Sequence, residues 1–253
     1  MRVALIADIH GNLEALEAVL ADIGREGVDR VICLGDVAAT GPKPHETIER
    51  LMELGFPTVM GNADEDMLRP LRPVSAAKAS EDARRVSDID RWGAGELSEK
   101  HLEYIRTFRT TVEVALEDGR SLLCFHGSPR SNTDVILSTT SEKELGAMLS
   151  GHTGADIMAG GHTHAQMMRR HGKSILVNPG SVGLPVDGEG EAAHNPPWAE
   201  YAVVSSGDGA SSVEMRRVAV DVEAVWGAAL GSGMPHAEWW ASDWKEWRDG
   251  SHA

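Results

Sequence analysis

Seven residues whose side chains can bind metal ions lie just after short apolar runs in this chain of 253 residues, each close to a glycine. They are Asp8, His10, Asp36, Asn62, His126, His162 and His164. Asp8 and His10 are two residues apart, so on an extended chain a carboxylate and an imidazole point to the same side. A single histidine in such a position is more often structural. Seven of these groups would be costly to bury together without a metal, which indicates a metal site.

The donor types narrow the choice of metal. Nitrogen and oxygen ligands without a thiolate favour Mn, Fe, Zn or Co over a structural zinc site of the cysteine type. Seven ligands exceed what one tetrahedral ion uses, and they suit two divalent ions that share one carboxylate and one water. Asp36 is the natural bridging ligand, because it follows the middle one of three successive predicted strands. Such a pair of ions would produce hydroxide at neutral pH and hold phosphate oxygens for in-line attack.

Hydrophobic periodicity predicts the elements that would position these residues. Apolar runs at 3–7, 29–34 and 56–60 indicate strands, with helices after the first and the second of them. The first helix would begin after Asn12, a favoured N-cap. Three successive strands that end in polar clusters would place Asp8, His10, Asp36 and Asn62 at one edge of a parallel sheet, where α/β proteins bind ligands.

The remainder of the chain is predicted to change from helices to hairpins within a single domain, 1–253. Residues 65–110 would be a helical insertion, either a cap over the site or a peripheral decoration. Hairpins are expected at 111–125, turning at Asp118-Gly119, and at 166–177. Strands at 201–204 and 213–218 would complete a second sheet.

The segment 220–253 is predicted to form a helix and a tail that carries four tryptophans. These are Trp239, Trp240, Trp244 and Trp247. The tail would either pack as a flap on the body or present a surface to a second copy of the chain or another partner.

Composition excludes several classes of function. A formal net charge of −15, without a basic groove, disfavours binding to long DNA or RNA and to anionic membranes. A nucleotide substrate is still compatible with this charge, because a bound metal can reverse the local charge. No apolar stretch reaches membrane-spanning length, and the first strand begins directly after Arg2, so no signal peptide is expected. Cys33 and Cys124 lie inside apolar runs as expected buried thiols, which favours a reducing cytoplasm.

The motifs Asp8-x-His10, Gly35-Asp36, Gly61-Asn62, His126 and Gly161-His162-x-His164 resemble those of the calcineurin-like metallophosphoesterase superfamily in order and spacing, over residues 3 to about 182. Finer features at 8–12, 35–42 and 178–183 resemble a small bacterial and archaeal phosphodiesterase-like branch. The resemblance implies an α/β fold (α+β by some schemes), a sandwich of two mixed sheets flanked by helices.

The same resemblance implies the two ligand sets. One ion would be held by Asp8, His10, Asp36 and His164, and the other by Asp36, Asn62, His126 and His162. Family members typically use manganese, iron, zinc, nickel or cobalt, and manganese is the expected ion here.

Two departures from the serine/threonine phosphatase branch bear on the activity. In that branch a histidine after the metal-binding asparagine protonates the leaving group, and here this position is Ala63. Asp64, which would orient it, remains either as a catalytic residue or as an ordinary acidic residue at a helix start, and Asn12 is a further catalytic candidate. The arginine motif after the second strand is also missing from 37–41. Both departures favour esters with good leaving groups, such as aryl diesters, cyclic nucleotides or pyrophosphates.

The sequence therefore predicts a cytoplasmic two-metal phosphodiesterase, in which a metal-bridging hydroxide attacks the phosphorus of a small phosphate ester or nucleotide. One alternative is a phosphomonoesterase acting on proteins or nucleotides, with acid help from His152 or another residue of the insertions. Another is a metal-binding scaffold that docks proteins through the terminal tryptophans, which would also be the contact in a homo-oligomer. Specificity would come from 65–110, 128–140 and 185–199.

Overall fold

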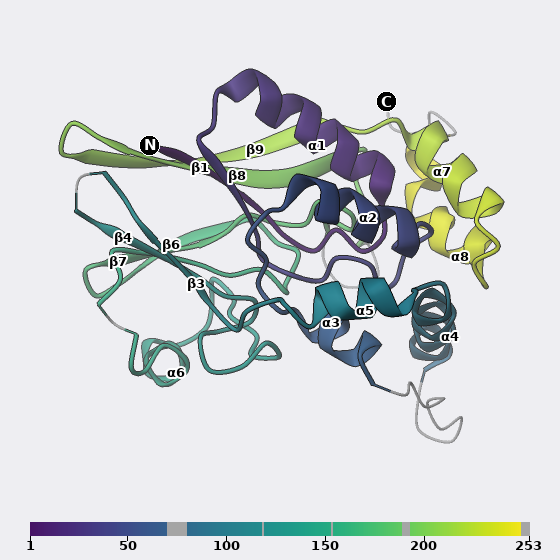
Figure 1. Cartoon of the computed structure of the whole chain (residues 1–253), viewed down its shortest axis with the longest axis horizontal. Coiled ribbons are helices and arrows are strands. Elements are labelled where there is room, and N and C mark those ends of the chain that lie inside the picture. Colours follow the sequence, from purple (N-terminus) through teal and green to yellow (C-terminus); the bar gives the residue numbers. More distant parts are fainter. Residues whose placement is uncertain (70–79, 118, 153, 189–192, 249–253) are drawn as a thin grey trace.

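The computed structural model describes residues 1–69, 80–117, 119–152, 154–188 and 193–248. Two β-sheets form the centre of the molecule, with helices on their outer faces (Figure 1). The first sheet has the order β2-β1-β8-β9 and the second the order β3-β4-β5-β7-β6. The strands are β1 (Arg2–Ile6), β2 (Arg30–Cys33), β3 (Val112–Ala115), β4 (Ser121–Cys124), β5 (Ile157–Ala159), β6 (Met167–His171), β7 (Ser174–Asn178), β8 (Trp198–Gly207) and β9 (Ala210–Ala219). This arrangement confirms the predicted sandwich of two mixed sheets.

Alternating side chains of β1 fill two separate cores. Ala4 and Ile6 pack toward α1 (Leu13–Glu26) and α2 (Pro44–Leu54), which cover the outer face of the first sheet. Val3 and Leu5 point the other way, into a cluster that also contains Leu122, Ile157 and Val177 of the second sheet. On the outer face of the second sheet, α6 (Glu142–Met148) contributes Leu145 to a third cluster. The layers are therefore helix, sheet, sheet and helix.

The first helix begins where the sequence predicts. Asn12 caps α1, because its side chain accepts a hydrogen bond from the Ala15 backbone N–H at 3.2 Å. Gly27 ends the helix in the left-handed conformation, with a φ of 61°. The loop from β1 thus enters α1 in a fixed geometry.

The expected place of the last two strands is wrong. β8 pairs antiparallel with β1, and β9 pairs with β8, so both belong to the first sheet rather than the second. The reason lies in β1: β2 occupies one of its edges, and the other edge needs a partner for its backbone groups.

The predicted third strand is also shorter than expected. Between residues 56 and 60 only isolated bridges form, from Cys33 to Thr58 and from Val59 to Arg109. Pro57 has no backbone N–H to donate, which limits a regular ladder there. The segment still runs parallel beside β2 and delivers Asn62 to the same edge as Asp8 and Asp36.

Two helices and the end of a third lie in the region 65–110, predicted to be a helical insertion. They are α3 (Asn62–Met67), α4 (Glu81–Gly95) and α5 (Glu99–Ile105). Both predicted hairpins are present, as β3–β4 and β6–β7, although Asp118 of the first turn lies outside the described residues. None of the helices in the described ranges is both long and apolar enough to cross a membrane.

The tryptophan-rich tail packs on the body of the molecule. α7 (Val222–Gly231), α8 (Ala237–Ala241), the 3₁₀ turn Ser242–Trp244 and α9 (Lys245–Arg248) follow β9, and Figure 1 shows α7 and α8 at the same end as α4. Trp240 and Trp244 are buried in one cluster with Ile89 of α4 and Val225 of α7. These two tryptophans therefore pack on the body as the predicted flap would. Trp239 is only partly buried, at the edge of the cluster.

Candidate metal centre

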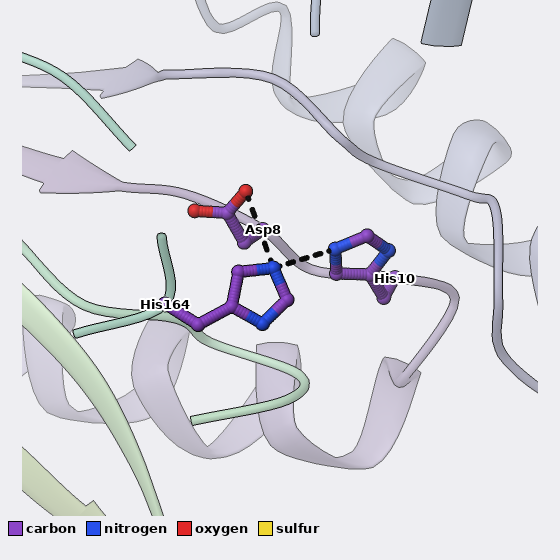
Figure 2. A group of neighbouring side chains, drawn as sticks. All are labelled: Asp8, His10 and His164. Atoms are coloured by element: carbon purple, nitrogen blue, oxygen red, sulfur yellow. Dashed lines mark hydrogen bonds and ion pairs between the residues drawn. The ribbon is translucent and has the colours of Figure 1, made fainter. Parts of the chain in front are cut away.

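All seven residues predicted from the sequence lie together where the two sheets present their strand ends. Asp8 and His10 follow β1, Asp36 follows β2, His126 follows β4, and His162 and His164 follow β5. Their ligand atoms form two groups, Asp8 with His10 and His164, and Asp36 with His126 and His162. Asn62, the first residue of α3, places its Oδ1 3.1 Å from His126 Nε2. Figure 2 shows the first group, in which one ring nitrogen of His164 faces both Asp8 and His10.

Asp36 lies between the two groups. Its Oδ2 is 3.3 Å from His126 Nε2 and 3.9 Å from His10 Nε2, while its Oδ1 accepts a hydrogen bond from Ala63 N at 2.8 Å. A carboxylate in this position can contribute to both sites, as expected of a bridging ligand.

The candidate ligands adopt an uncommon backbone conformation. Asp8, His10, Asp36, His162 and His164 have φ values of 55°, 49°, 54°, 69° and 56°. They make up five of the eight non-glycine residues with positive φ in the described part of the chain. Left-handed backbone costs free energy for such residues and concentrates at functional sites, where the surroundings enforce it.

Asp64 and Asn12, the two other catalytic candidates, lie behind the ligands. Asp64 is fully buried, and its carboxylate accepts hydrogen bonds from the backbone N–H groups of Asp36, Val37 and Gly61 at 2.7, 2.8 and 3.0 Å. Asn12 donates to Gly183 O at 3.0 Å while it caps α1. Neither lines the cavity at the centre. Both side chains thus fix the loops that carry Asp8, His10 and Asp36.

Close backbone approaches explain the glycines beside the ligands. A Cβ at Gly61 would lie 2.0 Å from Asp36 Oδ1, and one at Gly41 would lie 1.7 Å from His10 O. Both distances are far below van der Waals contact, so only glycine lets these loops pack against each other.

The histidine tautomers are set by backbone carbonyls. The Nδ1 atoms of His10, His126 and His164 lie 3.0, 2.8 and 2.8 Å from the carbonyl oxygens of Ala39, Leu34 and Leu184. Because a carbonyl can only accept, each Nδ1 carries a proton, and each ring offers the lone pair of Nε2 when it is neutral. Without a metal ion, burial lowers the pKa of His126 but the carboxylates of Asp36 and Asp8 outweigh burial and raise it to about 10, so an ion bound at this ring would displace its second proton. The Nε2 atoms of His10 and His164 face each other at 3.0 Å. Two facing lone pairs repel unless a cation lies between them, so these residues fit a metal ion.

The pKa shifts of the residues at the candidate centre also fit a bound metal ion. Burial lowers the pKa of His164 to about 3 and also lowers the pKa of His10, so both rings are neutral near pH 7. Burial raises the pKa of Asp8 to about 8. Burial would also oppose ionisation of Asp36, but the combined effects of His126, His10 and the Ala63 backbone N–H outweigh burial and hold that pKa well below its usual range. The cluster thus needs positive charge to ionise its carboxylates fully, and divalent ions supply it.

In a third group of potential ligands, the histidine has the opposite tautomer. His45, Glu49 and His101 lie together on α2 and α5. There the Ser98 backbone N–H donates to His101 Nδ1 at 3.2 Å, so the proton is on Nε2, which faces Glu49. This imidazole caps a helix and has no free lone pair for an ion.

A cavity of about 270 Å³ opens at the candidate centre. Its lining includes His10, Asp36, Asn62, His162 and His164, together with Ala39, Thr40, Ala63, Asp66, Met67, Val86 and Asp90. The described lining residues include no lysine or arginine. Sequence reasoning missed Asp66 and Asp90, for which the only signal was their place in the helical region. His152, the suggested acid, lines a different cavity beside Glu113.

Comparison with known proteins identifies the family of this chain and several related chains. A sequence model described as the calcineurin-like phosphoesterase superfamily domain matches residues 1–195. An uncharacterised protein of Methanocaldococcus jannaschii is 26% identical over 254 residues, 94% of each chain. Phosphodiesterase YfcE of Escherichia coli K12 is 26% identical over 200 residues, 74% of this chain and 83% of its own. A solved metallophosphoesterase from Sphaerobacter thermophilus is 26% identical over 96% of this chain and 98% of its own, with a TM-score of 0.72.

Proposed function

This chain belongs to the calcineurin-like phosphoesterase superfamily, and we propose that within this family of metal-dependent hydrolases it is a two-metal phosphodiesterase acting on small phosphate diesters. One ion is assigned to Asp8, His10, Asp36 and His164, and the other to Asp36, Asn62, His126 and His162. The observation that carries this assignment is the pair of facing Nε2 lone pairs on His10 and His164, 3.0 Å apart. Ions bound there would lower the pKa of a coordinated water and neutralise charge on phosphate oxygens.

The charge of the cavity favours diesters over monoesters. Beyond the assigned ligands, the lining carries the carboxylates of Asp66 and Asp90 and, among described residues, no cationic side chain. At neutral pH a diester has one negative charge and a monoester nearly two, so the monoester meets more repulsion. The 26% identity to the Escherichia coli protein named phosphodiesterase YfcE supports the same preference.

The residues around the ligands have positioning roles in this proposal. The backbone carbonyls of Leu34, Ala39 and Leu184 orient the histidine rings, and Asp64 holds the turn that presents Asp36. α4 acts as a cap, because Val86 and Asp90 on this helix form one wall of the cavity. The region 65–110 would thus help to select the substrate.

Manganese is the proposed ion, since the donor set contains only nitrogen and oxygen atoms. A cytoplasmic location is supported by Cys33 and Cys124, which are buried, unpaired thiols. Assembly through the tail stays a prediction. Trp240 and Trp244 pack within the chain, which leaves the partly buried Trp239 and Trp247 for such a contact.

The test is to compare hydrolysis of bis-p-nitrophenyl phosphate and p-nitrophenyl phosphate by purified, manganese-loaded protein. We expect a higher kcat/KM for the diester and a loss of at least about 100-fold in His126→Ala, because that variant loses a proposed ligand and the contact of its ring with Asp36. His171→Ala, which removes a histidine outside the centre, is the matched control. Faster cleavage of the monoester would favour the phosphomonoesterase, and inactivity with every divalent metal tried would overturn the enzymatic proposal.

A further inference from the structure

The cavity lacks the imidazole that protonates the leaving group in related phosphatases, because Ala63 occupies the position after Asn62. Esters of alcohols depart slowly as alkoxides and need a proton in the transition state. Two acidic residues on the cap side line the same cavity, Asp66 of α3 and Asp90 of α4. The side chain of Asp66 is 61% exposed and is held in an ion pair 3.7 Å from Arg69 Nη1. Asp90 is the better placed donor.

We propose that Asp90 is the general acid that protonates the leaving oxygen, and that Thr40 and Trp240 are positioning residues that hold it in the cavity. This inference rests on the proposed phosphodiesterase function. It gives a role to three features that the metal centre does not use: a partly buried carboxyl on α4, a strained threonine and a tryptophan of the C-terminal tail.

Thr40 connects the tail to the acid. Its hydroxyl donates to Asp90 Oδ1 at 2.7 Å, so in the acid form the proton belongs on Oδ2. Thr40 has a φ of 68°, a left-handed conformation that is rare for a β-branched residue. Trp240 Nε1 donates to Thr40 O at 2.7 Å and links this strained residue to the packed tail. The neighbouring Ala39 carbonyl faces His10 Nδ1, so one short segment positions both a ligand and the acid.

The surroundings of Asp90 keep its carboxyl partly protonated near neutral pH. Burial raises the pKa of Asp90 to about 6, against the opposing effect of its hydrogen bonds from Thr40. The charged groups of Asp36 and Asp66 raise it further, and the other titratable groups lining the cavity are His10, His162 and His164. A donor with a pKa just below the working pH is efficient in general acid catalysis.

The proton balance of the step is complete. Hydroxide forms a bond to phosphorus while the bond from phosphorus to the leaving oxygen breaks, and the electron pair of that bond goes to the oxygen. The proton of Asp90 Oδ2 moves to this oxygen, so the products are an alcohol, a phosphate monoester and the Asp90 carboxylate. Water returns the proton to Asp90 before the next turnover.

The test compares leaving groups in Asp90→Asn and in Asp88→Asn, a control on the same helix whose side chain pairs with His236. The substrates are bis-p-nitrophenyl phosphate, diphenyl phosphate and a dinucleoside phosphate, in order of poorer leaving groups. We expect kcat of Asp90→Asn to fall at least about 100-fold on the dinucleoside phosphate but less than about threefold on the nitrophenyl diester. The change in kcat near pH 6 that ionisation of Asp90 causes in the wild-type protein should be missing from this variant. Trp240→Phe, which lacks the indole N–H, should show a smaller loss of the same pattern.

Two outcomes would overturn this inference while leaving the phosphodiesterase intact. One is an equal loss of kcat on all three substrates in Asp90→Asn, which would indicate a structural role for Asp90. The other is that Asp66→Asn, rather than Asp90→Asn, loses kcat mainly on the substrates with poorer leaving groups. A second readout does not use activity: in metal-free protein labelled with ¹³C at aspartate Cγ, the carboxyl resonance that is missing from the spectrum of Asp90→Asn should titrate near pH 6. Asp64, whose pKa is also raised to about 6, should keep its resonance in that variant. If the Asp90 resonance titrates near pH 4 instead, Asp90 is not the acid. A wild-type protein inactive on every diester would instead contradict the proposed function.

Discussion

At the scale of single residues, the direction of one hydrogen bond separates a metal ligand from a structural histidine. His10, His126 and His164 each face a carbonyl with Nδ1 and direct Nε2 to the centre. His101 accepts from the Ser98 N–H at Nδ1 and directs a protonated Nε2 to Glu49. Both sets bring imidazoles and carboxylates together, so proximity alone does not identify a site. The tautomer decides, because only a free lone pair can bind an ion.

The raised pKa of Asp90 predicts a pH-dependent change in stability. The carboxyl has a pKa of 3.8 when free and about 6 in the folded protein, so the folded state binds the proton more tightly. The stability that this group contributes is present below pH 4 and is lost as the pH rises to 6 and beyond. After allowance for partial exposure, Asp90→Asn should gain about 1–2 kcal/mol over wild type at pH 7.5 and almost nothing at pH 4. Urea unfolding of metal-free protein at both pH values measures this difference.

Asp88→Asn is the control for that measurement, because the pKa of Asp88 is shifted in the opposite direction from that of Asp90. A hydrogen bond from His236 lowers the pKa of Asp88, so this variant should gain no stability as the pH rises. Equal pH profiles for the two variants would show that burial of Asp90 does not perturb its carboxyl.

At the scale of elements, the loops after the strands hold the centre through backbone contacts. The Asp8 N–H donates to Gly35 O at 2.9 Å and the His10 N–H to Asp36 O at 3.0 Å, so the turns after β1 and β2 continue to pair beyond the regular sheet. The turn after β7 adds the Ser181 hydroxyl, which donates to Asp8 O at 2.7 Å. These contacts enforce the left-handed backbone of the ligands, which their own side chains disfavour.

Gly61→Ala tests this tight packing. The new Cβ would lie 2.0 Å from Asp36 Oδ1, and the carboxylate of Asp36, the proposed bridging ligand, would have to move. We expect manganese affinity, measured by calorimetry, to fall at least about tenfold while the circular dichroism spectrum stays folded. Gly95→Ala at the end of α4 is the control, since a Cβ there meets no atom within 4 Å. Unchanged affinity in Gly61→Ala would mean that Asp36 does not bind the metal in the position described.

At the scale of the whole molecule, the proposed metal centre lies between the two sheets. Asp8, His10 and Asp36 follow strands of the first sheet, whereas His126, His162 and His164 follow strands of the second. Ions bound between them would therefore cross-link the sandwich at its functional edge. Because the unfolded chain cannot hold all these ligands together, metal binding should stabilise the fold.

Thermal unfolding tests this cross-link. Manganese added to chelator-treated protein at about 100 times its dissociation constant contributes about 2.7 kcal/mol per site, which for a chain of this size raises Tm by about 5–10 °C. His164→Ala should lose much of this rise, because it removes a ligand supplied by the second sheet. The same rise in both proteins would indicate that manganese binds elsewhere.

The sequence determined the parts of this protein that depend on local chemistry. Apolar runs followed by Asp, His and Asn next to glycine defined the candidate ligands, and Asn12 and the helical periodicity defined α1, because ligand types, capping and amphipathic spacing are local properties. The tertiary structure decided what depends on long-range pairing. It placed β8 against β1 rather than in the second sheet, and brought Asp90 and Trp240 to Thr40 across 50 and 200 residues. No local pattern encodes such contacts. A segment fills a particular sheet edge or cavity only because the rest of the packed molecule leaves that place free.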